Sequence, residues 1–90
     1  MIVEWTDSAI DEFIEILSKH TKSIAEKIAG EISIRVERLS EFPEKGRMVP
    51  EFNANHIREL IYKGYRVIYI ISDKIYIAHI RNSRQQLTDI

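Results

Sequence analysis

The chain has 90 residues, with 13 Lys or Arg against 14 Asp or Glu and no cysteine. This length predicts one small domain with a thin core, the missing cysteine excludes a disulfide framework or a thiolate metal site, and the net charge of −1 argues against wholesale non-specific nucleic-acid binding. The sequence has no run of 18 apolar residues and no basic flank of a signal peptide at its start, so we expect a cytoplasmic domain with no membrane contact.

The first twenty residues predict a short strand and a helix. Residues 2–5 are apolar, and Thr6, Asp7 and Ser8 are three successive candidates for a helix N-cap. The helix is expected to run to about residue 19. Its apolar positions recur at helical spacing and form one face: Ile10, Phe13, Ile14 and Leu17.

A second helix is predicted to end at about residue 40. Ser23 with Glu26 forms a plausible capping box, and Thr21 is the competing cap. Gly30 lies in mid-helix, where it costs about 1 kcal/mol relative to Ala. We therefore expect a close approach to the first helix or to the sheet at Gly30. The short break between the helices predicts an antiparallel helical hairpin.

A loop of about twelve residues is predicted between the second helix and the rest of the chain. Phe42 and Pro43 end the helix, and residues 44–55 follow as the loop. Loops of this length in small domains are frequently functional.

Residues 56–81 predict an antiparallel meander of three strands. The runs 56–62, 65–71 and 75–81 are rich in Ile, Val and Tyr, which suit a half-buried pleated surface. Lys63 and Gly64 form the first break, because glycine tolerates the positive φ of a two-residue hairpin turn. Ser72-Asp73-Lys74 forms the second break.

Strand alternation then assigns side chains to faces, if both turns have two residues. One face is predicted to carry Glu59, Ile61, Arg66, Ile68, Ile70, Ile77, His79 and Arg81. The other is predicted to carry Arg58, Leu60, Tyr62, Tyr65, Val67, Tyr69, Tyr76, Ala78 and Ile80. A three-residue loop at 72–74 would flip the third strand and break up the polar group on the first face.

These elements predict an α+β domain of order β-α-α-β-β-β, with the helical hairpin packed on one face of a small, mainly antiparallel sheet. One apolar face, Tyr-rich or Ile-rich, is then left open and predicts a covering partner. The Tyr residues are expected to pack against the helices rather than to stack on bases. Residues 82–90 are polar and predict a short helix or a frayed tail.

Several short sequence motifs, in this order, resemble those of the RelE/ParE superfamily of type II toxin–antitoxin toxins. They are residues 3–6 (VEWT), 42–43 (FP), 46–47 (GR), 50–51 (PE), 57–60 (IREL), 65–69 (YRVIY) and 77–81 (IAHIR). Each motif alone is weak evidence for the family, whereas the order and spacing of all of them over nearly the whole chain are specific. The resemblance implies a bacterial or archaeal toxin, bound in a hetero-oligomer by a cognate antitoxin whose partly disordered segment wraps its apolar grooves.

The resemblance leaves two activities open. RelE-like members cleave mRNA in the ribosome, and ParE-like members poison DNA gyrase without that chemistry. For cleavage, Arg66 and Arg81 match the arginines that hold the scissile phosphate, and His79 is the candidate base or acid. Glu51 or Glu59 would complete an acid–base pair. Lys45, Arg47, Arg58 and Arg84 are candidates for contact with nucleic acid or another target.

Two departures favour the ParE-like activity. Ribonuclease members usually carry Tyr or His shortly after the last strand arginine, and residues 82–87 (NSRQQL) have neither. Such enzymes also tend to be strongly basic. We therefore expect a gyrase inhibitor, with ribosome-dependent mRNA cleavage as the alternative.

The candidate residues also have structural explanations. A lone histidine on a strand, such as His79, more often has a structural role, and Arg66 has a competing explanation in a cross-strand ion pair with Glu59 worth about 0.2–1 kcal/mol. His20 and His56 have no partner at metal-ligand spacing. We therefore expect no metal and no cofactor.

Overall fold

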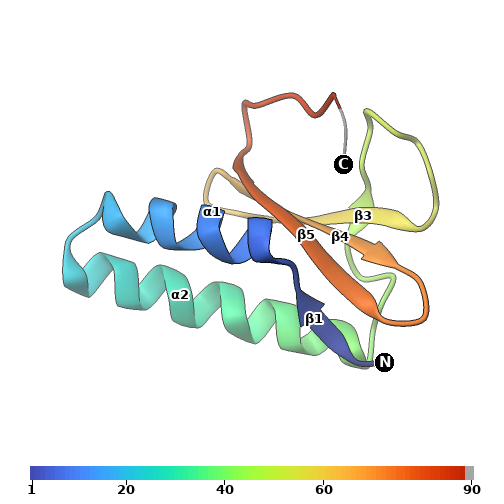
Figure 1. The fold of residues 1–90 in the computed structure, drawn as a ribbon, viewed down its shortest axis with the longest axis horizontal. Helices are drawn as coiled ribbons and strands as arrows, with labels where there is room; N and C mark the ends of the chain where they lie inside the picture. The colour runs from blue at the N-terminus through green and yellow to red at the C-terminus, as the bar shows by residue number, and fades with distance from the viewer. Residues whose placement is uncertain (89–90) are drawn as a thin grey trace.

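The computed structural model describes residues 1–88 as two helices and a five-stranded sheet (Figure 1). The elements are β1 (Val3–Trp5), α1 (Asp7–Ser18), α2 (Lys22–Glu37), the 3-10 turn η1 (Arg38–Ser40), β2 (Arg47–Met48), β3 (Ile57–Tyr62), β4 (Tyr65–Ile71) and β5 (Ile75–Asn82). The predicted α+β fold and its three long strands are confirmed to within a residue at each end. The two-residue strand β2 lies inside the predicted loop and was not expected.

The sheet has the order β1-β5-β4-β3-β2. β1 is parallel to β5, and every other pair is antiparallel. β1 therefore forms the edge of the sheet next to β5, at the opposite edge from β2. α1 follows β1 directly in the chain. Neither helix within residues 1–88 has the length and apolar character that crossing a membrane requires.

Threonine caps begin both helices. The Thr6 hydroxyl accepts a hydrogen bond from the Ala9 backbone N–H at 3.1 Å, and Thr21 does the same for Ile24 at 3.4 Å. Thr6 is one of the three predicted candidates. The predicted capping box at Ser23 is wrong, because the N-cap of α2 lies two residues earlier, at the competing cap Thr21.

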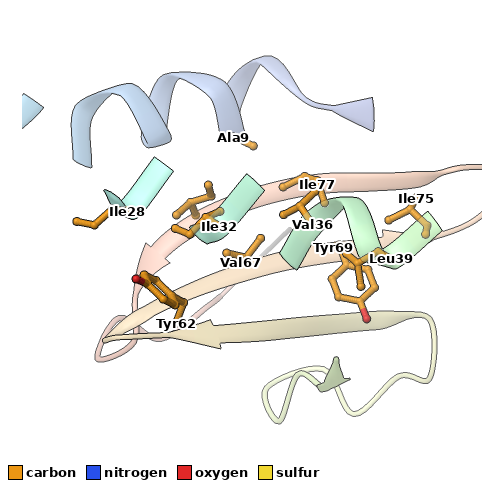
Figure 2. Close-up of a cluster of buried hydrophobic side chains, with 11 residues drawn as sticks. Ala9, Ile28, Ile32, Val36, Leu39, Tyr62, Val67, Tyr69, Ile75 and Ile77 are labelled. Carbon is orange, nitrogen blue, oxygen red and sulfur yellow. The ribbon is translucent and has the colours of Figure 1, made fainter. Parts of the chain in front are cut away.

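The main core lies between the helices and the Tyr-rich face of the sheet (Figure 2). Ile32, Val36 and Leu39 from the second helix and its final turn are almost fully buried there, against Tyr69 and Val67 of the sheet. The prediction that the tyrosines pack against the helices is confirmed for Tyr62 and Tyr69.

Gly30 does not make the predicted close approach. A Cβ added at Gly30 would meet nothing within 4 Å, whereas one at Gly46 would lie 2.5 Å from the Glu59 carbonyl oxygen and 2.7 Å from the Tyr69 hydroxyl. The buried Tyr69 hydroxyl donates to the Pro43 carbonyl at 2.7 Å and accepts from the Gly46 N–H at 2.9 Å. Tyr69 therefore fixes the start of the long loop.

The register of β5 differs from the prediction at two places, the turn before the strand and a bulge within it, and the two shifts offset each other. Ile71 pairs with Ile75, so the turn has three residues, which alone would flip the strand. A β-bulge then restores the phase, because Tyr69 pairs with Ile77 while Ile68 pairs with His79.

Because the two shifts cancel only beyond the bulge, the predicted face assignments hold in the second half of β5 and fail in the first half. Arg66 still pairs with Arg81, so the predicted polar group stays on one face. Between the loop and the bulge the assignments are wrong. Ile77 belongs to the core under the helices, and Tyr76 pairs with Ile70 on the other face.

The chain covers much of its own second face, contrary to the expectation of an open one. Val49 and Leu87 pack with Ile57 and Ile68 into a second small cluster. Phe52 adds to its edge. The predicted polar tail 82–90 contains no helix through residue 88, and its last two residues lie outside the described part of the chain. The tail and the loop before β3 lie on the side of the sheet away from the helices (Figure 1).

Candidate functional site

Arg66 is the centre of an ionic network on the second face of the sheet. Its Nε donates to Glu59 Oε1 at 2.6 Å, and its two terminal nitrogens form a bidentate pair with Glu51 at 2.7 and 2.9 Å. A fourth hydrogen bond goes to the Gln85 carbonyl at 2.9 Å. Four of the five guanidinium donors are thus used inside the protein, and Arg66 is only 5% exposed.

Glu51 links three segments of the chain. It pairs with Arg66 of β4 and also accepts the Leu87 backbone N–H at 3.0 Å, so it ties the long loop to the C-terminal tail. The hydrogen bonds from Arg66, and after them the Leu87 N–H, together lower the pKa of Glu51 to about 2. Glu51 is therefore a permanent anion near neutral pH and is poorly suited to proton transfer.

Glu59 has no exposed side-chain surface and is shared between two arginines. Its second oxygen accepts from Arg47 Nε at 2.8 Å, and the Arg47 side chain is 63% exposed. The predicted cross-strand pair between Arg66 and Glu59 is therefore present as part of a larger network. Arg47 has the most exposed side chain of the network.

His79 and Arg81 belong to a second cluster, centred on Glu12 of α1. The Arg81 Nε donates to Glu12 Oε2 at 2.6 Å, and His79 Nδ1 lies 3.0 Å from Glu12 Oε1. The same Oε1 accepts the Ile80 backbone N–H at 3.3 Å. Glu12 thereby provides an acceptor for the Ile80 N–H, which lies beyond the β5 residues that pair with β1.

The predicted triad of Arg66, His79 and Arg81 is therefore split between two sets of carboxylates. Arg66 and Arg81 are direct neighbours in the strand register, and like charges opposite one another destabilise a sheet. The carboxylates of Glu51 and Glu59 neutralise Arg66, and Glu12 neutralises Arg81.

The other predicted target-binding residues do not join one site. Arg58 is half-buried and holds the long loop, donating to the carbonyls of Asn55 at 2.9 Å and Gly46 at 2.8 Å. Lys45 and Arg84 are exposed, and their side chains make no ion pair within residues 1–88.

A cleft of about 660 Å³ lies over the Arg66 network. Its lining is Arg47, Pro50, Glu51, Ile61, Arg66, Ser83, Gln85 and Gln86. No cluster of His, Asp and Glu within the described residues is arranged to hold a metal ion. The cleft offers one exposed cation, Arg47, and several amide and hydroxyl groups, a lining suited to binding a polar surface.

Sequence reasoning missed the roles of Glu12 and Gln85. Glu12 lies in the first turns of α1, where the helix dipole favours any acid, and only the packing of α1 along β5 brings it to His79. Gln85 contributes a backbone carbonyl, which no sequence pattern indicates. Glu51 or Glu59 was expected to complete an acid–base pair in a ribonuclease, and both carboxylates instead bind Arg66.

Comparison with known proteins gives one family and one fold. The family model for the ParE toxin of type II toxin–antitoxin system, parDE, matches residues 3–87. A solved structure described as the chromosomal ParDE TA system from P. aeruginosa has a TM-score of 0.75, with 19% identity over 91% of this chain and 95% of that chain. No curated protein sequence matches significantly. This fold and a family match over nearly the whole length establish that the chain belongs to the ParE toxin family of type II toxin–antitoxin systems.

Proposed function

We propose that this toxin arrests growth by poisoning DNA gyrase, as a protein-binding inhibitor, and that a cognate antitoxin neutralises it. The toxin acts through its surface, with Arg47, Arg84 and Lys45 as exposed cations available to a target. Its family membership and the absence of an aromatic or imidazole side chain in residues 82–87 support this activity over ribonuclease chemistry.

The proposal rests mainly on the hydrogen bonds of Arg66, whose guanidinium donors are largely used inside the protein. Metal-free RNA cleavage requires cations directed at the phosphate where negative charge develops. Arg66 gives four hydrogen bonds to its own chain and is 5% exposed. To bind a phosphate it would have to leave Glu51 and Glu59, and this would leave the buried Glu59 carboxylate with Arg47 alone. Such an exchange carries a large desolvation penalty.

The second cluster supports the same proposal. A general base must reach its proton within hydrogen-bond distance. Only 14% of the His79 side chain is exposed, with its Nδ1 3.0 Å from Glu12 and 3.3 Å from the Arg81 guanidinium, so little of the ring can reach a substrate. His79 serves to hold α1 against β5, a role in which its removal weakens packing without removing a chemical step.

The test uses the purified chain in two assays run on one sample. Gyrase supercoiling and DNA cleavage are followed on plasmid DNA, and mRNA ends are mapped in a translating ribosome extract. We expect trapped gyrase–DNA cleavage complexes and intact mRNA. New mRNA cuts within the ribosomal A site would overturn the proposal and make Arg66, His79 and Arg81 catalytic candidates.

A His79→Gln variant separates binding from catalysis. We expect it to trap gyrase within about threefold of the wild-type chain, whereas loss of an acid–base group from a ribonuclease lowers the rate by about 10²-fold or more. The matched control is His56→Gln, because His56 is exposed and its side chain makes no hydrogen bond within residues 1–88.

A further inference from the structure

The outer edge of β3 is only half covered. β2 pairs with Arg58 and Glu59 and then ends, so Leu60 to Tyr62 have no strand partner on this side within the described residues. Tyr62 and Tyr65 flank the two-residue turn as a hydrogen-bonded pair. Alternation along β3 then directs the N–H and C=O of Ile61 away from β4, toward the free edge.

A groove of about 560 Å³ runs along this edge, beside α2. Its lining is Glu31, Ile34, Arg35, Arg38, Lys45, Leu60 and Ile61. Ile34 is 50% exposed and Ile61 is 47% exposed, although both are large apolar side chains. Leu60 lies on the helix side of the sheet, packed on the main core, and Ile61 on the opposite side, so the two faces of the strand meet at the groove.

The charges around the groove are unbalanced. Glu31 is bound by Arg35 one turn later on α2, and this hydrogen bond lowers the pKa of Glu31. Arg35 also lies 4.6 Å from the centre of the Tyr62 ring. Arg38 and Lys45 make no ion pair in the part of the chain that the structure describes. The groove therefore presents apolar side chains beneath two unneutralised cations.

We propose that this groove receives an extended segment of the antitoxin, apolar and acidic in alternation, which adds a strand to β3 in line with β2. The proposal rests on the proposed function for the existence of that partner. Strand addition satisfies the free backbone groups of Ile61. Successive side chains of the segment point to Ile34 and Leu60 on one side and to Ile61 on the other. Carboxylates beside them neutralise Arg38 and Lys45.

The same charges argue against a second copy of this chain as the occupant. A two-fold contact places the same patch of both copies together. Edge-to-edge pairing of two β3 strands would bring Arg38 and Lys45 of one copy close to those of the other. Like charges facing one another across an interface are costly.

The probe is a synthetic peptide of about ten residues that alternates Ile or Val with Glu or Asp, and the control peptide carries Lys at the acidic positions. Binding is followed by backbone amide NMR of the full chain. We expect only the acidic peptide to shift the Ile34, Leu60 and Ile61 signals. Exchange of the Ile61 amide hydrogen is expected to slow by at least about tenfold.

A charge-reversed chain tests the role of the cations. Arg38→Glu with Lys45→Glu is expected to weaken binding of the acidic peptide by about tenfold or more. Lys19→Glu with Lys22→Glu makes the same charge change at the far ends of the helices and is expected to leave it within about twofold. Urea denaturation of both double variants establishes that each is folded before binding is compared.

Four results would overturn the proposal: no binding of the acidic peptide, equal binding of the Lys peptide, equal weakening by both double variants, or an unprotected Ile61 amide. Dimerisation through β3, seen by sedimentation and abolished by the peptide, would make a second copy the occupant. These measurements use no gyrase, so a chain that binds the peptide but does not trap gyrase would refute the proposed target alone.

Discussion

Arg66→Met is expected to destabilise the fold strongly, because Arg66 neutralises a carboxylate that water cannot reach. The Glu59 side chain has no exposed surface and would keep only Arg47 as a partner, while Glu51, with 18% of its side chain exposed, would become partly hydrated. Removing one partner of a buried ion pair costs about 3–5 kcal/mol. The remaining Arg47 contact places the expected loss near the lower end, at about 3 kcal/mol.

Urea denaturation followed by circular dichroism measures this loss as a shift of the midpoint at constant slope. For a domain of this size, about 1 kcal/mol corresponds to about 4–8 °C in Tm, so the Tm should fall by at least about 12 °C. Arg84→Met is the matched control, since Arg84 is exposed and its guanidinium makes no hydrogen bond within residues 1–88. The control is expected to stay within about 0.5 kcal/mol of the wild type.

A double variant tests the reason for the loss. If the cost comes from an uncompensated buried charge, Arg66→Met with Glu59→Leu should recover at least about half of it, because both charges are then gone. The reasoning would be refuted by a loss below about 1 kcal/mol for Arg66→Met, or by single losses that simply add in the double variant. Either result would restore Arg66 as a residue free to bind an external phosphate.

The remaining predictions concern pH, the long loop and the glycine in the middle of α2. The free energy of unfolding should fall as the pH drops from about 4.5 toward 2, because the folded pKa of Glu51 is depressed to about 2 and its stabilisation is lost on protonation; acid titration of Glu51→Gln should lack this component. Gly46→Ala should cost about 1–3 kcal/mol in urea denaturation, because its Cβ would overlap the Glu59 carbonyl. Gly30→Ala should instead stabilise by up to about 1 kcal/mol, since it adds helix propensity in open space; destabilisation there would mean a hidden contact. Tyr69→Phe should cost about 1–3 kcal/mol by leaving two loop hydrogen bonds unmade, and an unchanged midpoint would show that the loop is held elsewhere.

Local pattern predicted the elements well because each carries its own signals. The Thr6 cap and the Lys63-Gly64 turn depend on neighbours within a few residues, and the structure confirms them. The predicted apolar face of the first helix is confirmed for Phe13 and Leu17. It is wrong for Ile10 and Ile14, which are 41% and 61% exposed. β2 carries no such signal. It has two residues and exists only because the loop returns along β3, which Tyr69 and Gly46 arrange.

Local sequence pattern did not determine the register between β4 and β5. The sequence does not distinguish a two-residue turn within 72–74 from a three-residue loop followed by a bulge at Ala78, since both keep Arg66 and Arg81 on one face. The difference appears only at Tyr76 and Ile77, which exchange faces. Packing selects the bulged form, in which Ile75 and Ile77 are fully buried beneath the helices.

The sequence by itself determined the fold class, the strands of the meander and the face shared by Arg66, His79 and Arg81, because these follow from periodicity and turn chemistry. Tertiary structure alone decided what those side chains do. Glu51 and Glu12 reach them from a loop and a helix distant in the chain. Whether a charged group is free for chemistry depends on the partners that surround it in space, and these two carboxylates occupy both arginines.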